Sequence, residues 1–316
     1  MKRFRHVPVS FFSQKGCLYL KKKRNYSGTL EMKIFPYILI APNALIFILF
    51  IAVPAVFGFY FSLTEWKGIG EPVFVGFANY VRAFHDIKFL QSLLRTSIYV
   101  LISLPLVMAL PLILASLMVR EFHLRGFFRA AYYWPSMISY IVAGISFKFI
   151  FGDNTGIINY LITLFGGEKV EWLTNPFNAM LVVVLANLWS RAGFYMVLYI
   201  SGLQSISTSY YEAANIDGAT NTQQFLYITL PMLKPTTFMV LILGLIDLFK
   251  AYGLVISLTG GGPGAATKFA VQYIYEKAFS EFSMGYASAL SMIMLAVMAI
   301  FTISQFKLSR GGQINE

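Results

Sequence analysis

Long apolar runs are the feature that most constrains how this chain can fold. A hydrocarbon core about 30 Å thick needs about 20 apolar residues for each helix that crosses it. Six stretches approach or exceed that length: 35–63, 93–119, 130–151, 179–203, 236–258 and 285–307. The third is interrupted by Pro135, Gly144 and Lys148. The sequence predicts an all-α integral membrane protein with six transmembrane helices.

The composition agrees with a chain embedded in lipid. Of its 316 residues, 57% are hydrophobic and 12% are charged, about half of the roughly 25% charge that is usual in soluble domains. Nine of the 25 lysines and arginines precede residue 34. Basic clusters beside apolar helices set membrane topology and bind anionic lipid headgroups, so we expect a membrane and not a nucleic acid as the partner of this charge. The single cysteine, Cys17, excludes a disulfide within the chain.

The basic residues also predict an orientation. With the N-terminus inside, the segments 1–34, 120–129, 204–235 and 308–316, with Lys307 at the edge, hold fifteen of them, and the outer segments hold seven. Because cytoplasmic loops carry the excess of Lys and Arg, both termini are predicted to be cytoplasmic. The outer segment 70–92 has apolar residues at helical spacing and predicts an amphipathic helix at the outer surface.

A polar stretch, EAANIDGATNTQQFLYITLP, lies at 212–231 between two apolar runs. Gly218 can adopt a positive φ and end a first short helix. Thr220 then offers an N-cap with Gln223 as its capping-box partner, and a second helix runs to Pro231. Two short helices joined by a glycine corner suit the groove of a partner protein; the alternative is a surface hairpin without a partner.

These residues carry a resemblance to a known family. Glu-Ala-Ala, three residues, Gly, nine residues and Ile-x-Leu-Pro resemble the EAA loop of binding-protein-dependent ABC importer permeases. The segment SLTGGGPGAAT at 257–267 is similar to the outer loop of the sugar permeases related to the larger maltose permease and the glycerol-3-phosphate permease. The run YILIAPNALIFILFIAVPAVFGFYFSLTEW and the segment VGFANYVRAF look like the same subfamily, so the resemblance covers roughly 35–307.

The resemblance implies a type I ABC importer permease fold: a basic cytoplasmic segment at 1–34, a permease domain at 35–307 with its EAA loop at 204–235, and a cytoplasmic tail at 308–316. That loop would form a coupling helix seated on a cytoplasmic ATPase. The residues implied in coupling are Glu212, Ala213, Ala214, Asp217, Gly218, Ile228, Leu230 and Pro231. A loop facing the binding protein is implied for Gly260, Gly261, Gly262 and Pro263.

The implied partners are a second permease that completes a heterodimer, two cytoplasmic ATPase subunits and an extracytoplasmic solute-binding protein. The chain has no GxxxxGK[ST] phosphate-binding loop. We therefore expect no enzyme activity and no cofactor in this chain, with ATP and Mg²⁺ bound by the partner ATPase. The expected location is the plasma (inner) membrane of a bacterium or archaeon.

Charged residues inside apolar spans mark a candidate solute pathway, because such charges usually face a water-filled cavity or a partner. Asp247 and Lys250 lie three apart, and they form either a mutually neutralising pair or a polar patch for sugar hydroxyls. Lys148, near the outer end of its span, can snorkel or line the path. The resemblance implies solute contacts from the spans on either side of the EAA loop. The predicted pathway residues are Asn187, Trp189, Ser190, Arg191, Phe194, Asp247 and Lys250.

The predicted function is import of a carbohydrate, an oligosaccharide in the first instance, driven by ATP hydrolysis in partner subunits. Within the family, glycerol-3-phosphate or another polyol or anion stays open: Arg191 and Lys250 suit a phosphate, and Asp247 does not. A stand-alone secondary transporter is a further alternative, and the lack of an evident internal repeat counts against it. No catalytic or metal-binding constellation is evident, which disfavours a membrane enzyme.

Overall fold

The computed structural model describes residues 30–308, with side chains from Phe35 to Lys307. Its contacts divide the chain after Ala55 into two units. The first unit holds helix α1 (Leu30–Phe47), the π-helical turn η1 (Ile48–Ala52) and the start of α2 (Val53–Ser62). The predicted N-terminal segment lies outside the described residues except for the first turn of α1. The predicted tail lies outside them except for Leu308.

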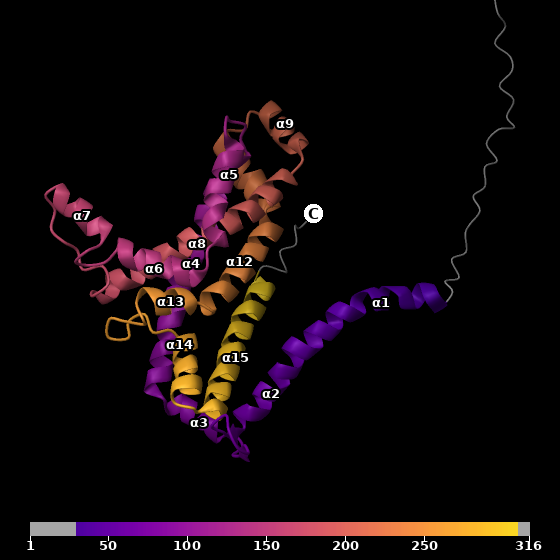
Figure 1. Ribbon diagram of the computed structural model, residues 1–316. Helices are drawn as coiled ribbons and strands as arrows, with labels where there is room; N and C mark the ends of the chain where they lie inside the picture. Colours follow the sequence, from indigo (N-terminus) through magenta and orange to yellow (C-terminus); the bar gives the residue numbers. More distant parts are fainter. Residues whose placement is uncertain (1–29, 309–316) are drawn as a thin grey trace, which may run out of the picture. The chain divides into compact units, whose positions relative to one another are not determined.

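The described part of the second unit, residues 56–308, consists of helices and loops and one short antiparallel hairpin (Figure 1). In chain order its elements are the end of α2, β1 (Thr64–Glu65), β2 (Val73–Phe74), α3 (Ala78–His85), α4 (Ile87–Val119), α5 (Arg125–Tyr133), η2 (Trp134–Met137), α6 (Tyr140–Ile150), α7 (Ile157–Leu164), α8 (Pro176–Gln204), α9 (Thr208–Ile216), α10 (Asn221–Gln224), η3 (Phe225–Thr229), α11 (Leu230–Met232), α12 (Lys234–Phe249), α13 (Gly253–Leu258), α14 (Ala270–Tyr275), η4 (Glu276–Ser280) and α15 (Met284–Leu308).

Within residues 30–308, four helical stretches are long and apolar enough to cross a membrane. They are Phe35–Ser62, Ile87–Val119, Pro176–Gln204 and Met284–Lys307. A fifth crossing is possible if the pair Asn221–Met232 and Lys234–Phe249, bent by 66°, counts as one span. The predicted helical membrane protein is thus confirmed, and four of the six predicted spans correspond to single long stretches.

The third predicted span, 130–151, is not one helix. Pro135 lies in the 3₁₀ turn η2, and Ile138 and Ser139 are extended. The Ser139 hydroxyl then accepts a hydrogen bond from the Ile141 N–H at 3.3 Å and starts α6 as a new helix. The extended residues and the new cap divide this span into α5, η2 and α6.

The fifth predicted span, 236–258, is also divided. Helix α12 ends at Phe249, and α13 starts at Gly253 and packs against α6. The approach is close: a Cβ added at Gly144 of α6 would lie 2.6 Å from the Leu254 carbonyl oxygen. This helix contact, which spans more than a hundred residues of sequence, accompanies the turn that ends α12.

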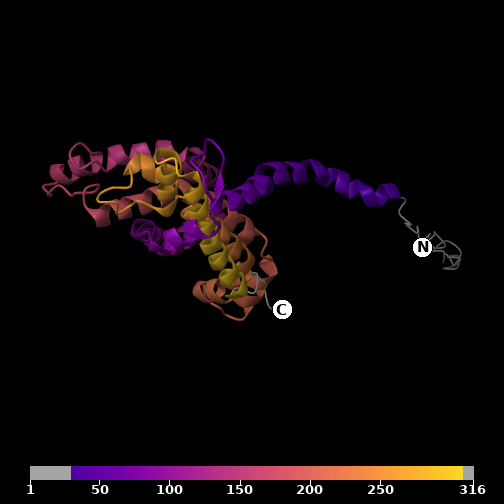
Figure 2. The ribbon, with the colours of Figure 1, turned by 90° about the horizontal axis from the view of Figure 1, so that it is seen from below.

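The core of the second unit lies between α4, α8, α12 and α13. Helix α4 starts at an Asp86 cap and packs along α8 (Figures 1 and 2). The rings of Tyr99 on α4 and Phe269 stack with centroids 4.6 Å apart. Helix α4 runs from α3 at one end of the unit to α5 and the α9 region at the other (Figure 1). The two ends carry different loops, which positions the candidate sites described next.

Candidate functional site

The corner at 216–220 joins α9 to α10 as the sequence predicts. Gly218 has φ 75°, the left-handed conformation that favours glycine. The Ala219 N–H donates to the Ala214 carbonyl at 2.9 Å, and the Gly218 N–H to the Asn215 carbonyl at 3.1 Å, the two bonds of a Schellman ending. Thr220 and Gln223 then form the predicted capping box that starts α10.

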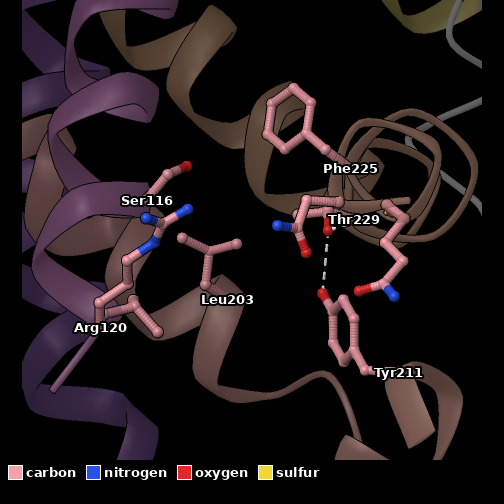
Figure 3. A pocket seen from close by; sticks show the side chains of 9 residues that line it. Ser116, Arg120, Leu203, Tyr211, Phe225 and Thr229 are labelled. Carbon is pink, nitrogen blue, oxygen red and sulfur yellow. Dashed lines mark hydrogen bonds between the residues drawn. The ribbon is translucent and has the colours of Figure 1, made fainter. Parts of the chain in front are cut away.

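Side-chain hydrogen bonds hold the two helices of this corner together. Gln224, which is buried, donates from Nε2 to Asn215 Oδ1 at 2.6 Å and to the Ala219 carbonyl at 3.2 Å. The hydroxyls of Tyr211 and Thr229 lie 2.9 Å apart and link α9 to η3 (Figure 3). Hydrogen bonds at two places therefore join the helices on either side of the corner.

Next to the corner lies a hollow of about 230 Å³, where the ends of α4 and α8 meet η3 (Figure 3). Its lining includes Ser116 and Arg120 from the end of α4, Leu203 from α8, and Phe225 from η3. The hollow places the corner beside the ends of two long apolar helices. The corner thus faces the ends of α4 and α8 across this hollow.

The outward face of the corner exposes apolar side chains among polar ones. Glu212, Ala213 and Asp217 are exposed, whereas Ile228, Leu230 and Pro231 are half-buried. Ile216 is 87% exposed and Tyr227 is 76% exposed. A second hollow, of about 350 Å³, is lined by Ala214, Asp217, Gly218, Ala219, Gln223, Gln224, Tyr227 and Ile228. The sequence argument overlooked Ile216 and Tyr227, although both lie within the loop.

A polar cluster forms inside the apolar part of the second unit, from three elements. Arg191 of α8 lies 3.4 Å (Nε to Oδ2) from Asp247 of α12. The Tyr195 hydroxyl donates to the same Asp247 oxygen at 2.9 Å, and Arg191 Nε donates to the hydroxyl of Tyr140 on α6. The Arg191 guanidinium also lies 4.6 Å from the centroid of the Tyr140 ring. The two charges neutralise each other, yet their side chains keep 27% and 32% of their surface exposed.

The other predicted pathway residues lie around this cluster or away from it. Asn187 is buried one turn before Arg191. The Ser190 hydroxyl is occupied by the Ala186 carbonyl at 2.8 Å. Trp189 is 42% exposed and contacts Phe147, with ring centroids 5.5 Å apart, instead of joining Arg191. Phe194 packs edge-on against Tyr195.

Lys250 lies three residues after Asp247, and this spacing suggested that the two side chains share one helix face. Lys250 is the exposed C-cap residue of α12. Among the described residues the ion-pair partner of Asp247 is Arg191 on another helix, so the expected local pair with Lys250 is replaced by a pair between helices. Tyr140 was missed by the sequence argument; the signal available was a tyrosine directly after the Ser139 cap at the start of an apolar helix.

The glycine-rich loop at 259–267 is compact. Gly260 and Gly261 have φ 65° and 91°, and Gln272 Nε2 donates to the Gly260 carbonyl at 2.9 Å. The hydroxyls of Thr259 and Thr267 lie 2.7 Å apart and tie the two ends of the loop. Gly262 and Pro263 complete the turn between them. In the part of the chain that is described, no group of three His, Cys, Asp or Glu side chains is placed to hold a metal ion.

Comparisons with known proteins agree with this geometry. Residues 75–311 match the family described as binding-protein-dependent transport system inner membrane component. The probable ABC transporter permease protein YurN of Bacillus subtilis is 35% identical over 290 residues, covering 90% of this chain and 98% of that protein. The sn-glycerol-3-phosphate transport system permease protein UgpA of Rhizobium meliloti is 34% identical, covering 87% and 94%.

A third relative and a solved structure extend the match. The probable starch degradation products transport system permease protein AmyD of Thermoanaerobacterium thermosulfurigenes is 32% identical and covers 89% of this chain and 96% of that protein. The fold is similar, with a TM-score of 0.77 at 23% identity, to a chain in the crystal structure of a bacterial ABC transporter involved in the import of the acidic polysaccharide alginate; 89% of this chain and 96% of that one are covered. The importer-permease prediction is thereby confirmed: this chain belongs to the binding-protein-dependent transport system inner membrane component family.

Proposed function

We propose that this chain is one of two permease subunits of an ATP-driven importer that moves a carbohydrate delivered by an extracytoplasmic binding protein. The observation that carries the proposal is the cross-linked corner at 216–220 within a chain whose residues 75–311 match the permease family. In this proposal residues 35–307 act as the permease domain. The EAA loop at 204–235, which contains α9, the corner and α10, forms the coupling helix.

The coupling role is proposed from the exposed apolar side chains near the corner and from the hydrogen bonds that join its two helices. The corner exposes Ile216 and Tyr227 beside the hollow lined by Ala214 and Gly218. Apolar anchors around a concave surface are what a helix-in-groove contact needs. Two ATPase subunits would bind ATP and Mg²⁺ and move the corner, and the corner would move the ends of α4 and α8. This chain itself would need no cofactor.

Support for a second permease comes from the first membrane-spanning stretch. Phe35–Ser62 is one of the helical stretches long and apolar enough to cross a membrane. Apolar helices of this kind pack against lipid and against the helices of a second subunit. We infer that the chain forms a heterodimer with a related permease. We also infer six membrane crossings, in which α5–η2–α6 forms the third and the bent region up to α13 forms the fifth. Both termini would be cytoplasmic, and the membrane would be the inner membrane of a bacterium or archaeon.

The polar cluster favours an uncharged solute. Arg191 already has Asp247 as its counter-charge, so it binds a phosphate or carboxylate less strongly than an uncompensated cation would. The hydroxyls of Tyr140 and Tyr195 add groups that suit sugar hydroxyls. We therefore propose a neutral carbohydrate. Glycerol-3-phosphate is the second candidate, favoured by the exposed Lys250 and by the name of a relative that is 34% identical.

The test is purification of the tagged chain from its native membrane, followed by reconstitution of the complex that it brings. We expect a phosphate-loop ATPase and a second permease in the eluate, and ATP-dependent transport of a neutral oligosaccharide in the presence of the binding protein. Transport that proceeds without ATP in vesicles containing only this chain would refute the importer reading. ATP-dependent uptake of glycerol-3-phosphate without oligosaccharide uptake would overturn the solute class alone.

A further inference from the structure

Helix α7 (Ile157–Leu164) presents an apolar face where a water-facing helix would be polar. It contains no charged residue. The exposed side chains along one face, continuing onto the next residue, are Ile157 (58%), Tyr160 (66%), Leu161 (42%), Leu164 (63%) and Phe165 (86%). Their spacing of three and four residues forms one continuous stripe. The remaining exposed side chain, Thr163, bonds through its hydroxyl to the Asn159 and Tyr160 carbonyls at 3.0 Å.

The polar side chain of this helix points inward. Asn159 is 2% exposed, and its Nδ2 donates to the Asp153 and Val170 carbonyls, each at 2.8 Å. Its Oδ1 accepts from the Val170 N–H and from Trp172 Nε1, each at 3.1 Å. Helix α7 thus has inverted polarity: its amide is buried against its own loop and its hydrocarbon faces outward.

The loop around α7 is built to hold that orientation. Asp153 accepts hydrogen bonds from the Leu173 and Thr174 N–H groups at 2.9 and 3.1 Å. Gly166, at φ 80°, closes the helix, with the Gly167 N–H donating to the Ile162 carbonyl at 2.9 Å. The apolar stripe is therefore displayed on a fixed scaffold and does not result from a loose loop.

The place of α7 in the chain brings it to the membrane surface. It lies between the end of α6 at Ile150 and the start of α8 at Pro176, which begins a membrane-spanning stretch. Phe149 and Phe177, near those two helix ends, are 71% and 70% exposed, so the flanking helices also expose apolar side chains next to the α7 loop. In two views α7 lies at the periphery of the second unit (Figures 1 and 2).

We propose that α7 is an interfacial helix whose apolar stripe is immersed in the outer leaflet of the lipid bilayer. A stripe of hydrocarbon with a tyrosine and without charge suits the boundary between headgroups and acyl chains. A site for a soluble protein would combine apolar anchors with charged groups, and the α7 helix contains no charged residue. The inference does not depend on which solute the transporter carries.

Site-directed spin labelling of the complete transporter in lipid nanodiscs tests this. In a Cys17→Ser background, which removes the single native cysteine, labels are placed at Leu161→Cys and Leu164→Cys. Lys169→Cys, in the exposed part of the same loop, is the matched control. Collisions with oxygen, which concentrates in the bilayer, are compared with collisions with a water-soluble nickel chelate.

We expect the ratio of oxygen to nickel collisions at 161 and 164 to be severalfold higher than at 169. A nickel-dominated ratio at both stripe positions would overturn the proposal and place the stripe in water. Protection of both positions from both reagents would overturn it in favour of a protein contact, and omission of the binding protein from the sample would then identify or exclude that partner.

Discussion

Asp247 is the shared partner of Arg191 and Tyr195 in the polar cluster. Asp247→Ala would leave Arg191 without its counter-charge and Tyr195 without its acceptor. Because both side chains keep about a third of their surface exposed, the penalty is well below that of a fully buried pair, about 1–2 kcal/mol. We expect solute uptake by cells to fall about tenfold, which corresponds to ~1.4 kcal/mol, with the protein still present in the membrane at its native amount.

A double-mutant cycle separates the pair from each residue alone. Arg191→Met combined with Asp247→Ala removes both charges, so its loss of uptake should be smaller than the product of the two single losses. Independent, multiplying effects would contradict the coupling of the two side chains. An unchanged uptake curve in Asp247→Ala would remove Asp247 from the solute pathway.

Asp86 gives a residue-scale prediction about pH. Burial alone would raise the pKa of Asp86, but hydrogen bonds from Tyr273 and Tyr286, at 2.7 and 2.8 Å, and from the Phe89 N–H outweigh it, with Lys277 adding a smaller effect. The net effect lowers the pKa of Asp86 below its ordinary value of 3.8. A carboxylate with a lowered pKa stabilises the fold above its unfolded-state pKa and loses that contribution as pH falls toward the folded-state pKa.

Thermal unfolding of the detergent-solubilised protein measures this effect. The stability advantage of the native chain over Asp86→Asn should be constant at pH 5 to 7 and should shrink below pH 3.8. Tyr273→Phe removes one of the two hydroxyl donors and should reduce the advantage while leaving the cap of α4 in place. An advantage that does not change with pH would mean that the ionisation of Asp86 contributes nothing.

The sequence predicted the charges of the polar cluster but not their partners. Arg191 and Asp247 were evident because a charge in an apolar run is costly. Their pairing depends on how α8 and α12 cross, and local spacing pointed to Lys250 instead. Tyr140 contributes through a hydroxyl from a third element, and its place directly after the Ser139 cap was the signal that the sequence offered for it.

At the scale of the element, the α9–α10 corner depends on the backbone of Gly218. A β-branched residue at φ 75° is strained by about 1–2 kcal/mol. A Cβ at Gly218 meets nothing within 4 Å in this chain, so Gly218→Val should leave the protein folded but distort the corner. We expect ATP hydrolysis by the reconstituted transporter to continue while transport falls, that is, uncoupling.

Asparagine is the matched control at this position. It is close to valine in size and adopts the left-handed conformation more readily. Gly218→Asn should therefore keep most of the transport that Gly218→Val loses. Equal losses in the two variants would point to steric exclusion of a partner and not to backbone strain, and normal transport in Gly218→Val would refute the coupling role.

A second element-scale prediction concerns the crossing of α8 with the end of α5. A Cβ at Gly193 would lie 1.9 Å from the Tyr132 carbonyl oxygen, whereas a Cβ at Gly126 of α5 meets nothing within 4 Å. Gly193→Ala should force the helices apart and cost about 1–3 kcal/mol. Gly126→Ala should be neutral or slightly stabilising because alanine favours a helix. Thermal denaturation of the two purified variants distinguishes them, and equal melting temperatures would contradict the close crossing.

The same crossings explain which elements the sequence could predict. The length of the apolar runs located the long spans, and the glycine and the capping box located the short helices around Gly218, because both signals are local in the sequence. The apolar runs merged α5, η2 and α6 into one span and α12 and α13 into another. Those divisions accompany contacts such as Gly144 against Leu254 and Gly193 against Tyr132, which join distant parts of the chain.

At the scale of the whole molecule, the loops at the two ends of the long helices agree with the sides of the membrane that the basic residues predict. The corner at Gly218 and the hollow at Arg120 lie at the end of α4 where the cytoplasmic segments were predicted. The hairpin, α3, the glycine-rich loop and the α7 loop connect the other ends of the spans. Solute entry, the polar cluster and the coupling corner would then follow one another across the bilayer.

Topology is the last prediction, and cysteine accessibility in intact cells tests it. In the Cys17→Ser background, Lys169→Cys, exposed in the α7 loop, should react with a membrane-impermeant thiol reagent from outside. Ile216→Cys, at a position that is 87% exposed, should react only after the cells are permeabilised. The physical reason is the excess of basic residues in the segments predicted to be cytoplasmic, because basic residues resist translocation. The opposite labelling pattern would place the Gly218 corner outside, where no ATPase could reach it, and would overturn both the orientation and the coupling proposal.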